Sequence, residues 1–420
     1  MDMGILFWGC TIIVVCIIAG VIFYKPYLGI VFVIVSIPFE GSIIFDYISV
    51  YPLEVILTIL FFTCIFKHIV STEHYFRNTR LVFYYIPFML CILLSALKFM
   101  EFPLMVKEIV RWLELIVVYF LTINLITDDK KVRVILYSIV LTTVIVSICG
   151  VINYLAGVAS IYKGRPGAYV FFGHPNALAG YVNLIIPVLF GMLMTSVFLW
   201  ERITLGIFTV LSIMAWFLTF SRSSWLSLIL TMILIFFLAK VKKRVAILLA
   251  MPFAIFAITF LSSNIKDDFI GRLGLQEVED RAMYYQIGFS MVKDDLIFGI
   301  GIGNYPLLIE KFTKMYMAIQ TNLHNLYLQV FVETGLMGLS TFVFWLAYMV
   351  KYLMGALKSL KMSRNYGLFV GLMGAIIVYL INNLANVLTV HGIHLQWGII
   401  LGLAVVLTQF RESETCLKTV

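Results

Sequence analysis

Two side chains in this mostly apolar sequence have a type and setting suited to chemistry, and the first is Arg222. It lies in the element Ser-Arg-Ser-Ser-Trp at 221–225, between two apolar runs with almost no loop. An arginine at membrane depth costs at least about 2.5 kcal/mol on insertion scales. One alternative is a side chain that reaches up to the lipid headgroups. The flanking serines favour a polar cavity, and a guanidinium binds phosphate oxygens bidentately, so we expect Arg222 to be an anion ligand.

His324 is the second, and it stands where a long polar stretch gives way to an apolar one. Asn322 could cap the helix that follows, and the positive end of a helix dipole disfavours an imidazolium. A neutral imidazole can accept a proton near pH 7, as a general base must. The alternative is a structural histidine that bonds loop carbonyls, with Asn325 as an ordinary support. Glu333 falls inside the apolar run, as a buried partner or beside a kink at Gly335.

A polar cluster upstream supplies further candidates for substrate binding. Pro175 discourages helix before it, so a loop should end and a span should begin near Asn176. His174 would be a turn residue if it has no ligand. Arg165 is of interest because the predicted topology puts it on the face that also holds Arg222.

The glycines at 299, 301 and 303 resemble a nucleotide loop only superficially. Asn304 occupies the last glycine position of Gly-x-Gly-x-x-Gly, and no Gly-Lys-Ser/Thr follows. We expect a tight turn that brings backbone close to a partner, and we count Gly301 and Gly303 among the substrate-binding candidates. Arg281 precedes this turn on a predicted short helix.

Other ionisable groups have simpler interpretations. Glu108, Arg111 and Glu114 fall at helical spacing on an apolar segment, as paired charges or as part of a segment in the interface. His391 and His394 form a His-x-x-His pair, but no third ligand lies nearby in the sequence, so we expect no metal. The six cysteines form no Cys-x-x-Cys pair, and we expect neither a disulfide framework nor a thiolate metal site.

The elements that must position these residues are membrane spans. The 420 residues are 62% hydrophobic and 12% charged, whereas soluble domains are about 25% charged. We therefore predict an all-α polytopic membrane protein with 12–13 transmembrane helices and one large extracytoplasmic loop carrying short helices. The predicted spans are 4–23, 27–44, 52–66, 81–97, 104–126, 132–155, 176–198, 203–220, 223–239, 245–262, 325–350, 365–388 and 393–410. Pro38 and Glu40 interrupt the second, so twelve is the alternative.

Basic residues orient this map. Of the 30 Lys and Arg, 18 fall on one side, which is then the cytoplasmic one. The loop and His174, His324, His391 and His394 would lie outside. We predict an N-terminal transmembrane bundle at 1–262, an extracytoplasmic loop at 263–324, and C-terminal helices with a short cytoplasmic tail at 325–420. The net charge of +8 fits basic loops facing anionic headgroups and needs no nucleic acid.

Four elements, in this order, resemble one family. They are Gly-His-Pro-Asn-x-Leu-Ala at 173–179, Ser-Arg-Ser-x-Trp at 221–225, Arg281 with Asp-Leu-Ile-Phe-Gly-Ile-Gly-x-Gly-Asn-Tyr at 295–305, and His-Asn-x-Tyr-Leu at 324–328 with Glu-x-Gly-Leu-x-Gly at 333–338. Together they make the chain similar to the O-antigen ligase and O-antigen polymerase superfamily of bacterial envelope glycan enzymes. The resemblance covers roughly 165–345; earlier residues resemble the family only in being hydrophobic spans.

The resemblance implies a metal-independent and cofactor-free glycosyltransferase in the bacterial cytoplasmic membrane, with its active site outside. It would move a glycan from undecaprenyl pyrophosphate to an acceptor hydroxyl on a glycan or glycolipid. Arg222 would bind the diphosphate, and His324 would deprotonate or orient the acceptor. Arg281 and Arg165 would add positive charge, and His174, Asn176, Asn325, Gly301 and Gly303 complete the candidate site.

Two questions stay open at this level. A polymerase would use a growing glycan as acceptor and a ligase a glycolipid, and the sequence does not choose between them. A lipid-linked oligosaccharide flippase or transporter would also use arginines in a membrane cavity, but such proteins often contain internal pseudo-repeats and need charge along the whole path. A non-enzymatic envelope scaffold would require neither His324 nor Arg222.

Overall fold

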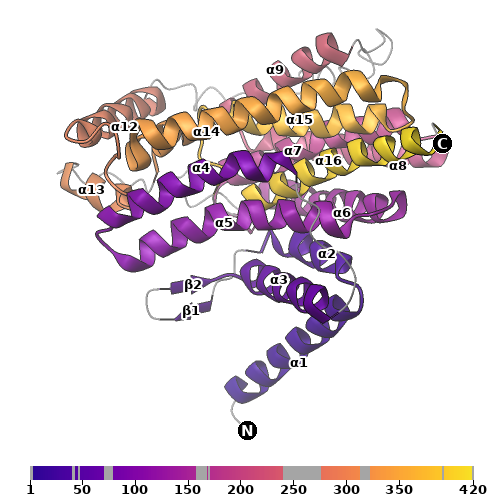
Figure 1. Cartoon of the computed structure of the whole chain (residues 1–420), viewed down its shortest axis with the longest axis horizontal. Helices are drawn as coiled ribbons and strands as arrows, with labels where there is room; N and C mark the ends of the chain where they lie inside the picture. The colour runs from indigo at the N-terminus through magenta and orange to yellow at the C-terminus, as the bar shows by residue number, and fades with distance from the viewer. Residues whose placement is uncertain are drawn as a thin grey trace.

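The computed structural model describes residues 3–39, 43–45, 48–70, 79–157, 168, 171–239, 276–312, 322–389 and 392–418. Within these ranges the chain is almost entirely α-helical, which confirms the predicted all-α fold, with one two-stranded hairpin as its only sheet. The long helices lie alongside one another, α1–α3 cross below them, and α12 and α13 lie at one end (Figure 1). The helices are α1 (Met3–Tyr24), α2 (Tyr27–Ser36), α3 (Pro52–Val70), α4 (Arg80–Ser95), α5 (Phe102–Leu125), α6 (Asp129–Leu155), α7 (Pro175–Thr195), α8 (Leu199–Leu218), α9 (Arg222–Ala239), α12 (Gln276–Val292), α13 (Tyr305–Phe312), α14 (Leu326–Ser359), α15 (Tyr366–Asn382) and α16 (Ile393–Lys418), with the 3₁₀ turns η1 (Ala96–Lys98) and η3 (Leu360–Met362).

The described helices confirm a polytopic membrane protein. Seven of them, α3, α4, α6, α7, α8, α14 and α16, are long and apolar enough to cross a membrane by length and composition. Apolar helices shorter than these occur in α1, α2, α9 and α15. Twelve of the thirteen predicted spans overlap a described helix, the second of them only in part, and the tenth, 245–262, lies outside the described residues.

The second predicted span is a correction. Helix α2 has ten residues and ends at Ser36, so at 1.5 Å per residue it covers about 15 Å. A bilayer core is about 30 Å thick. Pro38 lacks a backbone N–H and ends the helical pattern, and the chain then enters the hairpin β1 (Ile43–Phe45) and β2 (Ile48–Val50). The predicted span at 27–44 is therefore not one helix, and the interruption lies at Pro38, where the sequence indicated it.

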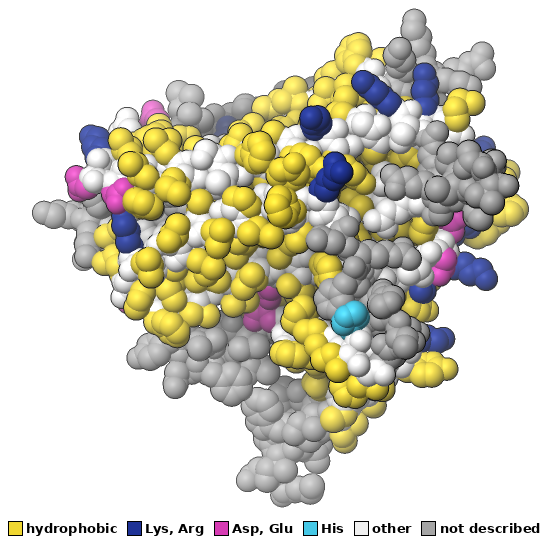
Figure 2. Space-filling model, in the orientation of Figure 1, with side chains coloured by type: hydrophobic (Ala, Val, Ile, Leu, Met, Phe, Trp, Pro, Cys, Tyr) yellow, Lys and Arg dark blue, Asp and Glu magenta, His cyan; other side chains and the backbone are white. Residues whose placement is uncertain are grey.

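The core is built around α7, α15 and α16. Small residues bring α7 and α15 together: a Cβ on Gly371 would lie 2.5 Å from the Pro187 carbonyl oxygen and 2.8 Å from the Gly191 Cα. Such close approach is typical of helices packed in membranes. In α16 the side chains from Trp397 to Leu407 are at most 2% exposed. Hydrophobic side chains also spread over most of the visible outer face, as lipid contact requires (Figure 2).

Helix α14 is broken near its N-terminus, and the glycine-rich segment 295–304 fills the break. Gly335 has φ 67° and ψ −167°, which interrupts the helical hydrogen bonds. The segment replaces them: Ile300 N–H donates to the Val332 carbonyl at 2.9 Å, and Leu336 N–H donates to the Leu296 carbonyl at 2.8 Å. A Cβ on Gly299 would lie 2.6 Å from the Val332 oxygen. Glycine is needed because backbone packs directly on backbone.

Polar side chains hold this segment in place. Lys98 Nζ bonds Asp295 and donates to the Gly299 carbonyl at 2.8 Å. The Lys98 hydrogen bond, with a backbone bond from Phe298, keeps the pKa of the Asp295 carboxyl below its usual range. Asn304 Nδ2 donates to the Lys98 carbonyl at 2.8 Å, so the segment is joined to the α4–α5 turn as well as to α14.

Gly335→Ala is expected to lower the free energy of unfolding by about 2–4 kcal/mol, since its backbone lies in a region open essentially to glycine. A Cβ there would also overlap the Ile297 carbonyl oxygen. Thermal melting of the purified protein in detergent measures the effect. Gly355→Ala in the same helix is the matched control, because a Cβ at Gly355 meets nothing within 4 Å. Equal melting temperatures for the two variants would contradict the assigned role of the break.

Candidate functional site

His324 lies in a tight turn at the start of α14. Its backbone is left-handed, with φ 51°, and its N–H donates to the Asn322 side-chain oxygen at 3.0 Å. Asn325, not Asn322, is the N-cap of α14: its side chain accepts from Leu328 N–H at 3.0 Å. The predicted cap was therefore wrong by three residues, and the two asparagines instead fix the turn on both sides of the half-buried histidine.

Helix α12 packs against this turn and carries Arg281 to it. The Tyr284 ring lies 6.5 Å from the His324 ring, centroid to centroid. Gly288 allows close approach, because a Cβ there would be 3.1 Å from Leu323. Arg281 is half-buried and lies three residues before Tyr284, and residues at this spacing share a helix face. Tyr284 and Gly288 therefore lie on the face of α12 that packs along the His324 turn, and Arg281 is at the spacing that shares this face.

A chain of hydrogen bonds joins the start of α14, just after His324, to the start of α9, which holds Arg222. The first N–H of α14, from Leu326, donates to the carbonyls of Asn383 at 2.9 Å and Asn386 at 3.1 Å. Asn386 Nδ2 then donates to Ser223 Oγ at 2.9 Å. Ser223 is the neighbour of Arg222 in the first turn of α9. Two motifs about 100 residues apart in the chain are therefore linked through the turn after α15.

The serines around Arg222 are used to hold α9 in place. Ser224 Oγ accepts from Trp216 Nε1 at 3.0 Å and donates to the Ala179 carbonyl at 3.3 Å, which ties the start of α9 to α8 and α7. Ser223 is bonded to Asn386. Their presence was interpreted as the lining of a polar cavity, but these two hydroxyls contact neighbouring helices. They fix the half-buried Arg222 at the end of a rigid element.

His174 is the N-cap of α7. Its Nδ1 accepts from Asn176 N–H at 3.0 Å, and Pro175 occupies the first helical position. Asn176 thus contributes at least its backbone N–H to this cap. Arg165 and His391 lie outside the described residues.

Backbone strain coincides with the motifs. Within the described ranges, three non-glycine residues have positive φ: Phe171 at 48°, Phe220 at 55° and His324 at 51°. Phe171 precedes His174 by three residues, and Phe220 precedes Arg222 by two. Left-handed backbone is unfavourable for bulky residues and gathers at functional sites. The strained positions therefore mark the same three elements that the sequence singled out.

Hydrogen bonds connect the N-terminal turns of three helices. Ser224 in the first turn of α9 contacts Ala179 in the second turn of α7, and the start of α14 reaches the start of α9 through Asn386. Each helix N-terminus carries about half a positive charge, and such ends bind anions. With Arg222 and Arg281, the arrangement provides a positively polarised site.

A cavity of ≈ 380 Å³ adjoins the turn. Asn322 and Leu326, on either side of His324 in sequence, both line it, as do Gln329 and Glu333 of α14. Gln329 connects the wall to the turn: its side-chain oxygen accepts from Leu323 N–H at 3.0 Å, and its amide donates to Glu333 at 3.2 Å. The cavity wall and the turn that holds His324 are thus connected by side-chain hydrogen bonds.

The opposite wall of the cavity comes mainly from the charged face of α5. Arg111 and Glu108 form an ion pair at 2.5 Å, as predicted from their spacing, and Lys107 and Glu114 line the cavity beside them. Glu114 lies 3.4 Å from Nε2 of His394, a buried residue in the first turn of α16. Carboxylates, cations and the aromatic ring of Trp112 together suit a ligand with many hydroxyl groups.

Two residues of this site were missed in the sequence, and two predicted residues have a structural setting that the sequence did not show. Gln329 was not considered, although it lies four residues before Glu333 and so on the same helix face. Lys107 was not singled out beside the charged triplet of α5. Gly301 and Gly303, which were predicted to bind substrate, are buried, and a Cβ on either would lie about 3.0 Å from backbone near Lys98 or Leu104. Their described contacts are with the protein itself.

Comparison with known families agrees with these motifs. Residues 207–343, about a third of the chain, match the family model described as O-antigen ligase. The matched stretch contains Arg222, Arg281, the glycine-rich segment and His324. A comparison with functionally curated proteins finds no match. The family match agrees with the resemblance seen in the motifs: residues 207–343 of this membrane protein are similar to the O-antigen ligase family.

Proposed function

We propose that the protein transfers a glycan from a polyprenyl diphosphate carrier, undecaprenyl pyrophosphate, to an acceptor hydroxyl at the outer face of the cytoplasmic membrane. One observation carries the proposal: hydrogen bonds connect the N-terminal turns of α7, α9 and α14 through Ser223 and Ser224, next to Arg222, and α14 begins two residues after His324. A diphosphate is the anion that this positive polarisation would suit.

The chemistry needs two complementary groups. His324 would take the proton from the acceptor hydroxyl, whose oxygen forms the new bond to the anomeric carbon of the donor sugar. The bond from that carbon to the diphosphate oxygen breaks, and the polyprenyl diphosphate leaves with the electron pair. Arg222, with Arg281 one helix over, would stabilise the charge that develops on the leaving oxygens.

The cavity along α5 and α14 would receive the acceptor glycan. Glu108, Glu114 and Glu333 can accept hydrogen bonds from sugar hydroxyls, and Lys107 and Arg111 can donate them. Trp112 adds an aromatic surface of the kind that binds the apolar faces of sugars. Donor and acceptor would then meet at His324, whose sequence neighbours Asn322 and Leu326 line the cavity.

The outer-face assignment is supported by the distribution of basic residues. Arg133 and Arg364, assigned to the cytoplasmic side by charge, lie together around a separate pocket near the starts of α6 and α15. His324 lies at the opposite end of the long helices, near α12 (Figure 1). The rule that basic residues face the cytoplasm then puts His324 outside.

The test is incubation of the purified protein in nanodiscs with an undecaprenyl-pyrophosphate oligosaccharide from the host, followed by gel analysis. A ladder of longer carrier-linked glycans would identify a polymerase. No ladder, but transfer once host glycolipid is added, would identify a ligase. Absence of turnover with both acceptors would contradict the proposal and favour a lipid-linked oligosaccharide flippase, which transport of a labelled carrier in proteoliposomes would detect.

Transfer should be unaffected by metal removal. In the proposed reaction the arginines and helix ends carry the charge that a divalent ion would otherwise neutralise. The purified enzyme is therefore expected to keep its full rate in excess EDTA. A loss of activity that added Mg²⁺ or Mn²⁺ restores would rule out the metal-free mechanism.

A further inference from the structure

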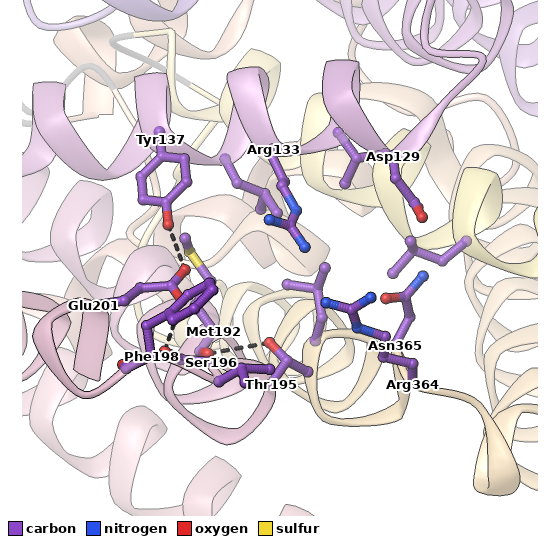
Figure 3. A pocket seen from close by; sticks show the side chains of 15 residues that line it. Asp129, Arg133, Tyr137, Met192, Thr195, Ser196, Phe198, Glu201, Arg364 and Asn365 are labelled. Atoms are coloured by element: carbon purple, nitrogen blue, oxygen red, sulfur yellow. Dashed lines mark hydrogen bonds between the residues drawn. The ribbon is translucent and has the colours of Figure 1, made fainter.

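A second pocket, far from His324, is formed where α6, α8, α15 and α16 meet. It has a volume of ≈ 80 Å³ and is lined by the first two turns of α6, the turn between α7 and α8, and the start of α15. Arg133 extends into it from α6, and Arg364 and Asn365 lie across the space from Arg133 (Figure 3). Three donor-bearing side chains from two separate elements therefore converge on one small pocket.

Glu201, one of the two acidic residues that line the pocket, already accepts two hydrogen bonds from its neighbours. Glu201 accepts from Tyr137 Oη at 2.6 Å with one carboxylate oxygen and from Ser196 Oγ at 2.8 Å with the other. Arg202 is held too, because its Nε and Nη2 donate to the Ser196 carbonyl at 3.0 and 2.9 Å. Arg133 also attracts Glu201 electrostatically, but no ion pair within 4 Å joins them.

Arg133 and Arg364 differ from Arg202 in this respect. Within the described part of the chain, neither makes a hydrogen bond or an ion pair within 4 Å. Asp129, the other acidic lining residue, is exposed in the first turn of α6 and forms no such pair with them. Two guanidinium forks aimed at one space match the geometry of a phosphate group, which each can bind bidentately.

The surroundings indicate the source of that phosphate. The turn between α7 and α8 exposes four large apolar side chains at the pocket's rim: Val197, Phe198, Leu199 and Trp200 are 61–73% exposed. The rings of Phe198 and Trp200 stack at 6.3 Å. Exposed aromatic residues next to arginines mark the boundary between hydrocarbon and water. A phosphate located there is carried by a lipid headgroup.

We propose that this pocket binds the phosphodiester of an anionic phospholipid. Arg133 and Arg364 clamp the phosphate oxygens, Asn365 donates to the headgroup, and the acyl chains lie along the exposed side chains of the α7–α8 turn. Basic pockets between membrane helices are recognised sites for anionic lipids. The site is independent of the proposed glycan transfer, and it would hold the starts of α6 and α15 together.

The test compares three forms of the full chain, purified in a non-ionic detergent and stripped of lipid: wild type, R133Q/R364Q and K130Q/K361Q. Lys130 in α6 and Lys361 in η3 are exposed residues close in sequence to the two arginines, and neither lines the pocket. The two double variants therefore lose the same charge. The melting temperature is measured against added phosphatidylglycerol, phosphatidylcholine, or inorganic phosphate in phosphatidylcholine.

Phosphatidylglycerol is expected to raise the melting temperature of the wild type and of K130Q/K361Q at the same lipid concentration. R133Q/R364Q should need at least about tenfold more lipid for half the shift, since hydrogen bonds to charged groups are the strong ones. An equal response in R133Q/R364Q would overturn the proposal. A full shift from inorganic phosphate would overturn the lipid assignment and indicate a free-anion site. Should the double variant not fold, an unchanged lipid response in R364Q alone would overturn it too.

Discussion

Replacing His324 by alanine is expected to slow glycan transfer by about 10²–10⁴-fold, the usual contribution of a general acid–base residue. The histidine borders the cavity through Asn322 and Leu326 and contacts α12 through Tyr284. Initial rates with the carrier-linked oligosaccharide, measured in nanodiscs, give the effect directly.

Because His324 has a left-handed backbone, alanine could act by disturbing the turn instead of removing a base. His324→Asn separates the two effects, since asparagine tolerates this conformation but cannot accept the proton. We expect H324N to melt like the wild type and to be as slow as H324A. His68→Ala, in the last turn of α3, controls for loss of a histidine elsewhere. Wild-type rates in H324N would remove His324 from the mechanism.

Replacing Arg222 by alanine should cost about 10²–10³-fold in rate, similar to the loss of one preorganised charge-stabilising donor. Ser224 and Ser223 hold the arginine against α7, α8 and the Asn386 turn, so its guanidinium is aimed before substrate binds. A preorganised charge acts most strongly where water is excluded. Rates at saturating donor, with the amount of bound donor measured separately, would show the loss.

Arg222→Lys tests whether geometry or charge matters. Lysine keeps the charge but not the planar fork, and we expect it to recover only part of the lost rate. Arg80→Ala is the matched control, because Arg80 is an exposed arginine at the first position of α4. If R222A transferred glycan as fast as R80A, the assignment of Arg222 to the leaving diphosphate would be untenable.

Much of the fold and the position of the site could be predicted from local patterns. Apolar runs of about 20 residues are read from sequence with little ambiguity because the bilayer fixes their length. The motifs around His174, Arg222 and His324 were also recognisable, since polar residues inside apolar runs need a reason. The second span failed because Pro38 and the hairpin after it shorten α2, a local signal that was noticed but given too little weight.

The partner of the glycine-rich segment could not be predicted. Gly299 and Gly301 are followed by Asn304, a pattern that signals close backbone approach but not what is approached. That partner is the break in α14, more than 30 residues further along the chain. Contacts of this kind depend on how the two segments are placed in space, and the residue pattern within either segment does not predict that placement.

The charged triplet of α5 was identified, but its setting was not. Its spacing correctly predicted the pair of Arg111 with Glu108. The cavity exists only because Gln329 and Glu333 of α14 face the same space from a segment more than 200 residues later. The sequence showed only charged residues on one face of an otherwise apolar helix. That pattern is consistent with a cavity as well as with the membrane interface.

The apolar run of α16 has a bioenergetic consequence. His394 borders the larger cavity and Leu407 borders the second pocket, and the 13 helical steps from one residue to the other correspond to about 20 Å. From Trp397 to Leu407 this helix has no ionisable side chain, and its side chains are at most 2% exposed. It gives protons no relay between the two cavities and leaves the membrane potential nothing to act on. In the proposed glycan transfer the cleaved sugar–diphosphate bond supplies the driving force, so we expect transfer not to require a membrane potential.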